Sequence, residues 1–332
     1  MRSVVASLVS VPITTTDRQT VAAVAAIAVV TVIVTIASMS RWRSARRFIA
    51  STRTIRTGQP GLYAVTGAEA GLGLATTAAL VEAGATVVMG VQDVQKGRAI
   101  ADKINGVTKQ TSAIMLGDIS LNMGDACSID KWSQALLDRL HKDGERLEAL
   151  VHQAGVMGLG KYTTTTDGHE MQWAINFVGP FRLTQRLWDV LVKDSTRILC
   201  RTSASHCTPD APLDWARSET EYHGWRAYQQ SVLASLLFSN ELNRRLADIG
   251  AHATSHAVAE SDKWYIHPKL LLPDDRAELA SGPTTTLAVL GGVGTGGEYL
   301  IRGAVGTPGT HGTCKADARR LWEATMNELA QN

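Results

Sequence analysis

The sequence lacks the features that mark several specialised classes of protein. Its 332 residues contain 33 Lys and Arg against 31 Asp and Glu, and this net charge of +2 gives no support for a nucleic-acid-binding surface or an acidic tail. Only four cysteines are present, without a CxxC pair, so neither a disulfide framework nor a structural zinc site is expected. With nine prolines and 45% hydrophobic residues, the chain is neither disordered nor fibrous. We expect a globular protein of a reducing compartment, with no metal and no nucleic-acid partner.

Charge is unevenly distributed, and one uncharged stretch stands out near the amino terminus. Residues 1–60 hold eight Arg and one Asp, whereas residues 21–40 are uncharged and consist mostly of Val, Ala, Ile and Thr. As a helix, these residues reach about 30 Å, the thickness of the hydrocarbon part of a bilayer. The pattern predicts a transmembrane helix over 21–40, between an amino-terminal segment (1–20) and a basic linker (41–60). A buried core helix and a cleavable signal peptide are the alternatives.

The arginines around this stretch predict its orientation. Two arginines, Arg2 and Arg18, precede it, and six follow it, namely Arg41, Arg43, Arg46, Arg47, Arg53 and Arg56. The positive-inside rule places the more basic side in the cytosol or in the matrix-like interior of an organelle. We therefore expect a single-pass protein of the mitochondrial inner membrane or the endoplasmic reticulum, with its folded part on that side.

Residues 61–332 show strands that alternate with helices. Continuous apolar runs predict strands at 62–65, 85–91, 112–116, 147–151 and 196–202. Helical patterns lie between and after them, at 94–105, 129–140, 168–192 and 227–249. This alternation predicts an α/β domain with a Rossmann-type doubly wound parallel sheet.

Three glycines lie between the first predicted strand and the helix that follows it. Gly67, Gly71 and Gly73 allow a tight turn and let backbone N–H groups approach a pyrophosphate, while the helix N-terminus supplies partial positive charge. The position after a strand and before a helix is the context in which this spacing binds dinucleotides. A glycine turn needed only for packing is the alternative.

Six motifs along the chain together resemble one known family. They are TGxxxGxG at 66–73, an acidic turn at Asp118, AGVM at 154–157, Asn176, Thr202-Ser203 and Tyr228. In this order the motifs resemble the short-chain dehydrogenase/reductase family. The segments VVMGVQDVQKG (87–97), AYQQSVLASLLFSNEL (227–242) and RRLWE (319–323) are similar to its branch of retinol dehydrogenases and WW-domain-containing oxidoreductases.

The resemblance implies hydride transfer between a nicotinamide and a carbonyl or alcohol. It implies that Ser203 hydrogen-bonds the carbonyl oxygen, that Tyr228 is the general acid or base, and that Asn176 holds a water in the proton relay. NAD(H) or NADP(H) is the implied cofactor, and the residues implied to bind it are Thr66, Gly67, Gly71, Leu72, Gly73, Asp118, Ala154 and Gly155.

Several positions depart from the family pattern. Val232 takes the place of a lysine that normally binds the nicotinamide ribose and favours the tyrosinate by its charge. His152 and Gln153 replace two asparagines. Gln92 stands where relatives selective for a 2′-phosphate carry arginine, and Glu69 brings a carboxylate into the phosphate loop, so NADP(H) is expected to be disfavoured.

These departures leave two hypotheses for function. The first is a membrane-anchored, catalytically impaired protein that is a structural or accessory subunit of a membrane complex, by resemblance one of the respiratory-chain type. The second is an active, membrane-bound NAD(P)-dependent dehydrogenase of the retinol or steroid type, which uses Ser203 and Tyr228. The membrane and either other subunits or a second copy of the chain are the expected partners.

Overall fold

The computed structural model describes residues 61–108, 111–207, 213, 219–259, 290, 292, 294–301 and 303–331. Contacts divide the chain into two units, Met1–Ser44 and Ala45–Asn332, and every described residue belongs to the second. The predicted transmembrane helix at 21–40 therefore lies outside the described residues. Among the residues that are described, no helix is both long enough and apolar enough to cross a membrane.

A single sheet of eight strands forms the centre of the described domain. Its order is β3-β2-β1-β4-β5-β6-β7-β8, and every pair is parallel except β7 with β8. The strands are β1 (Gly61–Thr66), β2 (Thr86–Gly90), β3 (Ala113–Ile114), β4 (Arg146–His152), β5 (Arg197–Thr202), β6 (Thr254–Ala259), β7 (Tyr299–Ile301) and β8 (Ala304–Val305). The predicted Rossmann-type parallel sheet is confirmed. The strand order reverses between β1 and β4, and in such sheets ligands bind outside the carboxyl ends of the strands at this point.

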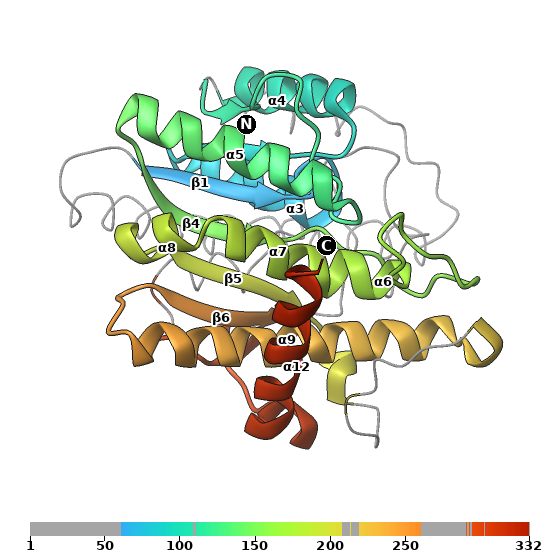
Figure 1. Cartoon of the computed structure of the whole chain (residues 1–332). Helices are drawn as coiled ribbons and strands as arrows, with labels where there is room; N and C mark the ends of the chain where they lie inside the picture. Colours follow the sequence, from blue (N-terminus) through green and yellow to red (C-terminus); the bar gives the residue numbers. More distant parts are fainter. Residues whose placement is uncertain are drawn as a thin grey trace, which may run out of the picture. The chain divides into compact units, whose positions relative to one another are not determined.

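Helices cover both faces of the sheet. They are α3 (Gly71–Glu82), α4 (Val94–Thr108), α5 (Ala126–Asp143), α6 (Met171–Trp173), α7 (Gly179–Arg186), α8 (Trp188–Asp194), α9 (Gly224–Asp248) and α12 (Lys315–Leu329). Short turns of 3-10 helix lie at Ala204–Cys207, Glu219–Glu221 and Thr310–Thr313. One apolar core joins the sheet to α5, α7 and α9, which lie in front of the strands in Figure 1, and a second core joins its other face to α3 and α4.

The sequence predicts one helix over 168–192, but the structure divides this segment. A π-helix, η1 (Ala174–Val178), lies between α6 and α7, and the Gly179 N–H donates to the Ala174 carbonyl five residues earlier. Pro180 has no N–H with which to continue the α-helical pattern. A Cβ on Gly179 would lie 2.3 Å from the Met123 carbonyl oxygen, so the glycine permits a close approach to that segment. The helix ends again at Leu187, where φ is −100° and ψ is 3°.

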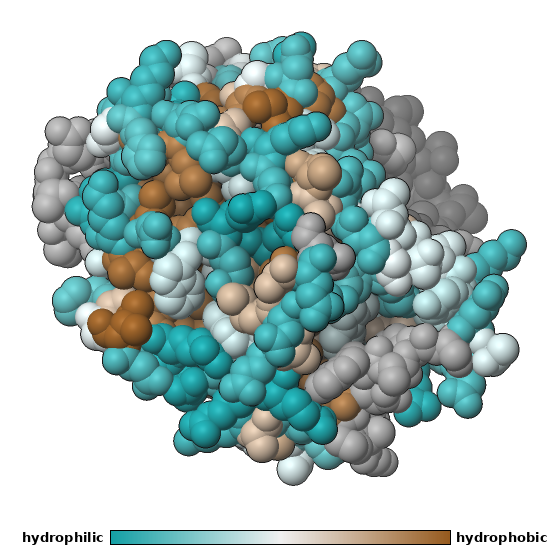
Figure 2. All heavy atoms as spheres, in the orientation of Figure 1, coloured by the Kyte–Doolittle hydropathy of each residue, from teal (hydrophilic) through white to brown (hydrophobic). Residues whose placement is uncertain are grey.

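The face that carries α5, α7, α9 and α12 has a mixed surface. In Figure 2 hydrophilic residues cover most of this face, and hydrophobic residues lie in separate areas between them. Two of the large apolar side chains that remain exposed are Trp225, which is 41% exposed, and Met326, which is 39% exposed. The expected partner subunits or second copy stay a prediction.

Candidate active site

The loop between β1 and α3 has the geometry of a phosphate-binding turn. Gly67 and Gly71 adopt positive φ angles of 64° and 50°, which favour glycine. A Cβ on Gly73 would lie 2.1 Å from the Gly67 carbonyl oxygen, so the loop folds directly over the first turn of α3. The residue before α3, Ala70, makes no side-chain cap. The N–H groups of Gly71, Leu72 and Gly73 at this helix start therefore suit an anion.

Thr66 connects this loop to the end of β4. The threonine is fully buried, and its Oγ1 accepts hydrogen bonds from the N–H groups of Gln153, at 3.1 Å, and Ala154, at 3.0 Å. A Cβ on Gly67 would lie 2.8 Å from Cα of Ala154, so the loop and the residues after β4 are in close contact. The predicted cofactor-binding residues Thr66, Gly67 and Ala154 thus lie together where the strand order reverses.

The two side chains that replace the family's asparagines are both buried, one at the last residue of β4 and one directly after it. His152 has an N–O distance of 3.0 Å to the Thr184 hydroxyl, and burial lowers the pKa of its imidazole to about 3. The histidine is therefore neutral at physiological pH. Gln153 Nε2 donates to Thr76 of α3 at 3.5 Å. These residues link β4 to α7 and α3, so the altered pair still has polar partners on both sides.

Glu69 reaches from the glycine loop to the residues after β2. One carboxylate oxygen accepts the Gln92 N–H at 2.8 Å, and the other is buried without a hydrogen-bond partner among the described residues. In a Rossmann domain an acidic residue after the second strand accepts the 2′-hydroxyl of the adenosine ribose. Glu69 comes from a different segment but brings its carboxylate to the same end of β2. Sequence spacing placed Glu69 against the phosphates, whereas the structure places it beside Gln92.

Asp118 lies apart from this group. Its carboxylate forms an ion pair with Arg98 of α4, and both side chains are largely exposed. The chain meets the end of β2 three residues later, where the Leu121 N–H donates to the Val91 carbonyl at 2.6 Å. Asn122 follows at this edge, and its Oδ1 accepts the Gly124 N–H at 3.0 Å. The structure thus places Asn122, and not Asp118, next to the end of β2, and the sequence singled out Asp118 because an acidic residue was expected there.

Asn176 lies in the π-helix and connects three segments. Its side-chain amide forms two hydrogen bonds with the backbone of Val156, both at 2.9 Å, and donates a third to Ser231 at 2.9 Å. Pro180, four residues later, has no N–H to donate to the Asn176 carbonyl. That carbonyl therefore lacks its α-helical donor, and the resemblance implies that Asn176 holds a water of the proton relay here. Such π-helical turns are frequent at functional sites.

Hydrogen bonds of neighbouring residues connect the segments that carry Tyr228, Ser203 and Asn176. Ser231, which binds Asn176, donates to the Tyr228 carbonyl at 2.7 Å within the first turns of α9. Thr202, directly before Ser203, donates to the Val232 carbonyl at 2.7 Å. The end of β5, the start of α9 and the π-helix thus form one connected network.

The hydroxyl groups of the two candidate catalytic residues keep donor capacity that the described residues do not use. Ser203 Oγ accepts the N–H of Ser205 at 3.2 Å and its hydroxyl at 2.8 Å, which leaves the proton of Ser203 free to donate. None of the described residues hydrogen-bonds to the Tyr228 hydroxyl, and the ring lies 5.5 Å from that of Trp225. Val232, at the position of the family's lysine, is 3% exposed and supplies no charge.

Comparison with known proteins identifies the family. A family model described as short chain dehydrogenase matches residues 62–208. Retinol dehydrogenase 13 of Homo sapiens is 30% identical over 277 residues, a match that covers 78% of this chain and 81% of that protein. This chain belongs to the short-chain dehydrogenase family. Within the family it lies in the retinol dehydrogenase-like branch, as the resemblance predicted.

Two further matches agree with membership in the short-chain dehydrogenase family. Retinol dehydrogenase 14 of Homo sapiens is 32% identical over 220 residues, which cover 62% of this chain and 65% of the relative. The crystal structure of an uncharacterized protein from Mycobacterium Paratuberculosis is 27% identical and has a TM-score of 0.65, with 82% of this chain and 96% of that chain covered. The fold therefore rests on sequence and structure alike, and the branch rests on the sequence relatives.

Proposed function

We propose that this chain is a dehydrogenase that transfers hydride between NAD(H) and an alcohol or carbonyl substrate. The observation that carries the proposal is that hydrogen bonds connect the segments that carry Asn176, Ser203 and Tyr228, which are the π-helix, the end of β5 and the start of α9. A dinucleotide suits this place because Gly73 lets the loop fold closely over the first turn of α3, and because the N–H groups at the start of α3 have no side-chain cap. When bound, the nicotinamide supplies or accepts the hydride.

The chain's own residues have distinct parts in the proposed reaction. The free proton of Ser203 hydrogen-bonds the substrate oxygen and stabilises the negative charge that develops there. The Tyr228 hydroxyl gives a proton to that oxygen during reduction and takes it back during oxidation. A water on the Asn176 carbonyl then exchanges this proton with solvent.

The substrate is proposed to be an alcohol or aldehyde on an apolar carbon skeleton. The relatives reported above are named retinol dehydrogenases, and Trp225 offers an exposed apolar ring beside Tyr228. Such a substrate partitions into membranes, which agrees with an anchor at 21–40 and a folded domain on the cytosolic or matrix-like side. We therefore propose a single-pass anchor with this orientation, in either the mitochondrial inner membrane or the endoplasmic reticulum.

Val232 is the observation that favours the other hypothesis, an accessory subunit without redox activity. Loss of the lysine removes a cation that favours the tyrosinate. The relatives described above are named as dehydrogenases and not as subunits of a complex, and this supports the enzyme over the accessory subunit.

Turnover by the full-length protein in detergent separates the two candidates. We expect NADH-dependent reduction of retinal, with the Tyr228→Phe variant at least about 100-fold slower because general acid–base catalysis contributes at this scale. Tyr63→Phe is the matched control, since it removes the same hydroxyl in the first half of β1. Equal turnover by the parent and Tyr228→Phe would contradict the assigned role of Tyr228. An inactive parent that migrates with a large membrane complex would establish the accessory subunit instead.

A further inference from the structure

Arg201 is an unexpected cation near the end of β5. The strand is central, and the neighbours Cys200 and Thr202 are buried, as in a strand covered on both faces. Arg201 is half-buried, and its carbonyl accepts the Ser235 hydroxyl at 2.7 Å, which fixes the strand against α9. Its guanidinium extends to the neighbouring strand end, where Nη1 donates to the Gln153 carbonyl at 3.2 Å.

The guanidinium occupies the space beside Gly155. A Cβ on Gly155 would lie 2.6 Å from Arg201 Nη1 and 3.0 Å from Asn176 Oδ1. Glycine is therefore required at position 155 for Arg201 to lie here. The arginine thus lies next to two positions that the sequence assigns to the site, the Ala154-Gly155 turn and Asn176.

The charge of Arg201 has no acidic partner among the described residues. No carboxylate in the described ranges lies within 4.0 Å of this guanidinium, whereas Arg182, Arg186, Arg244 and Arg245 all pair with acids. A guanidinium has five N–H donors, and the described surroundings accept one of them. A half-buried cation with free donors at the carboxyl ends of the strands suits an anionic or hydroxyl-rich ligand.

The strand order indicates which part of a dinucleotide lies here. The glycine loop follows β1, and Glu69 and Gln92 mark the adenosine end beside β2. Arg201 lies on β5. In the sheet, β2 is on one side of β1, whereas β4 and then β5 are on its other side. A dinucleotide whose pyrophosphate binds at the glycine loop therefore extends its second ribose toward β4 and β5.

We propose that Arg201 binds the pyrophosphate and second ribose of the dinucleotide, and so supplies the cation that Val232 does not. This inference rests on the proposed function, because it assumes that a dinucleotide binds at the glycine loop. The Arg201 guanidinium and Asn176 Oδ1 both lie beside Gly155, and the Asn176 amide donates to Ser231, the residue before Val232. The guanidinium therefore lies near the region that a lysine at position 232 would reach.

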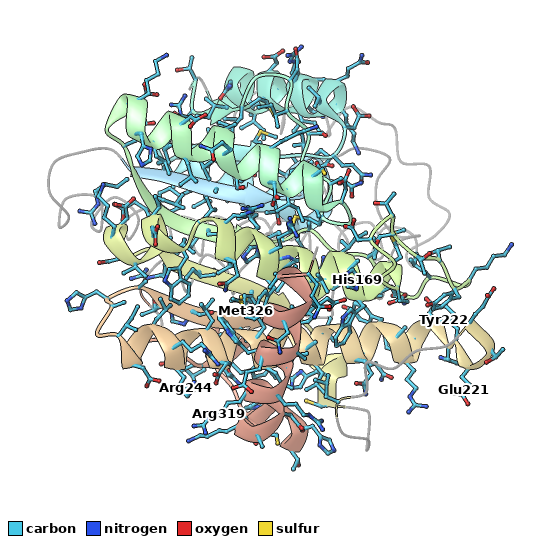
Figure 3. The ribbon with its side chains drawn as sticks, in the orientation of Figure 1. His169, Glu221, Tyr222, Arg244, Arg319 and Met326 are labelled. Atoms are coloured by element: carbon cyan, nitrogen blue, oxygen red, sulfur yellow. The ribbon has the colours of Figure 1, made fainter. Side chains whose placement is uncertain are left out.

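Binding of three ligands to the full-length protein tests this role. AMP contains only the adenosine half, ADP-ribose adds the pyrophosphate and the second ribose, and NADH adds the nicotinamide. For Arg201→Met we expect ADP-ribose and NADH to bind about tenfold more weakly or worse, since charged hydrogen bonds are lost, and AMP to bind as in the parent. Arg319→Met is the matched control. Figure 3 shows Arg319 on α12, away from the start of α9 near Tyr222.

A rescue variant distinguishes a lost cation from a disturbed fold. Adding Val232→Lys to Arg201→Met should restore most of the ADP-ribose and NADH affinity, and Arg201→Lys should retain much of it. Equal losses for AMP and ADP-ribose, or an absence of rescue, would show a structural role and overturn the proposal. Unchanged NADH binding in Arg201→Met would overturn it while leaving the proposed function intact. A parent that binds none of the three ligands would overturn both.

Discussion

Replacing Gly73 by alanine is expected to damage the dinucleotide site and the fold together. The added Cβ would lie 2.1 Å from the Gly67 carbonyl oxygen and 3.1 Å from that of Thr66. The first distance is more than an ångström shorter than the 3.4 Å at which ordinary van der Waals contact begins. Both neighbours are backbone atoms, so the loop between β1 and α3 must move as a whole.

The size of the effect follows from two opposing contributions. Forcing an extra methyl group into a packed place costs about 1–3 kcal/mol, and a backbone clash belongs at the upper end of that range. In the opposite direction, alanine in place of glycine within a helix stabilises the helix by up to about 1 kcal/mol. We expect a net loss of about 1–2 kcal/mol in the free energy of unfolding, and a loss of NADH binding because the start of α3 no longer faces the pyrophosphate.

Gly106→Ala is the matched control for this prediction. Gly106 also lies in a helix, α4, and a Cβ there would have no neighbour within 4 Å. This variant should gain about 0.5–1 kcal/mol and bind NADH normally. Urea unfolding and calorimetric titration with NADH measure both quantities. If Gly73→Ala were as stable as Gly106→Ala and bound NADH equally well, the close contact of the loop with α3 would be wrong.

Three further predictions concern selectivity, acid stability and the membrane. Glu69→Gln removes the carboxylate beside Gln92 and should raise NADPH affinity relative to NADH by about five- to tenfold in calorimetric titration; an unchanged ratio would refute the role of that charge. The pKa of His152 is lowered to about 3, so its stabilising contribution is complete above about pH 6.5 and is lost as the pH falls from there toward 3. Between pH 7 and pH 5 the parent should therefore lose about 2 kcal/mol in the free energy of unfolding, because the imidazole is protonated in the unfolded chain but not in the folded one. Urea unfolding at the two pH values should show a smaller loss for His152→Asn. Removal of residues 1–44 should release the protein from membranes into carbonate extracts, and a truncated chain that stays in the pellet would show another means of attachment.

The alternation of strands and helices could be predicted because local patterns determine it. Apolar runs at 62–65 and 147–151 lie in β1 and β4, and the three loop glycines lie between β1 and α3. The break in the helix over 168–192 could not be predicted from periodicity, because the apolar pattern continues through it. Its causes are the missing N–H of Pro180 and the contact of Gly179 with Met123, and the second of these depends on the folded chain.

Site residues could be predicted where their own backbone conformation or size is needed. They could not be predicted where their role depends on which residues the fold brings next to them. Gly67 and Gly73 are needed for their conformation and size, so their spacing indicated them. Arg201 gave no sequence signal, since only the fold places its guanidinium against Gly155. Glu69 was correctly singled out as a departure, but the hydrogen bond to Gln92 gives its carboxylate a partner that spacing did not reveal.

The π-helix makes the length of one segment as important as its residues. A π-helical turn contains one residue more than an α-helical path of the same rise, and each residue of an α-helix turns the chain by about 100°. Deleting a single residue within Ala174–Val178 would let the segment close into regular α-helix, with α6 and α7 kept in phase but with the residues between them shifted around the helix axis. Asn176 could then no longer face both Val156 and Ser231, although every side chain around it was unchanged. Insertions and deletions in this stretch are therefore expected to be far less tolerated than substitutions on its exposed side.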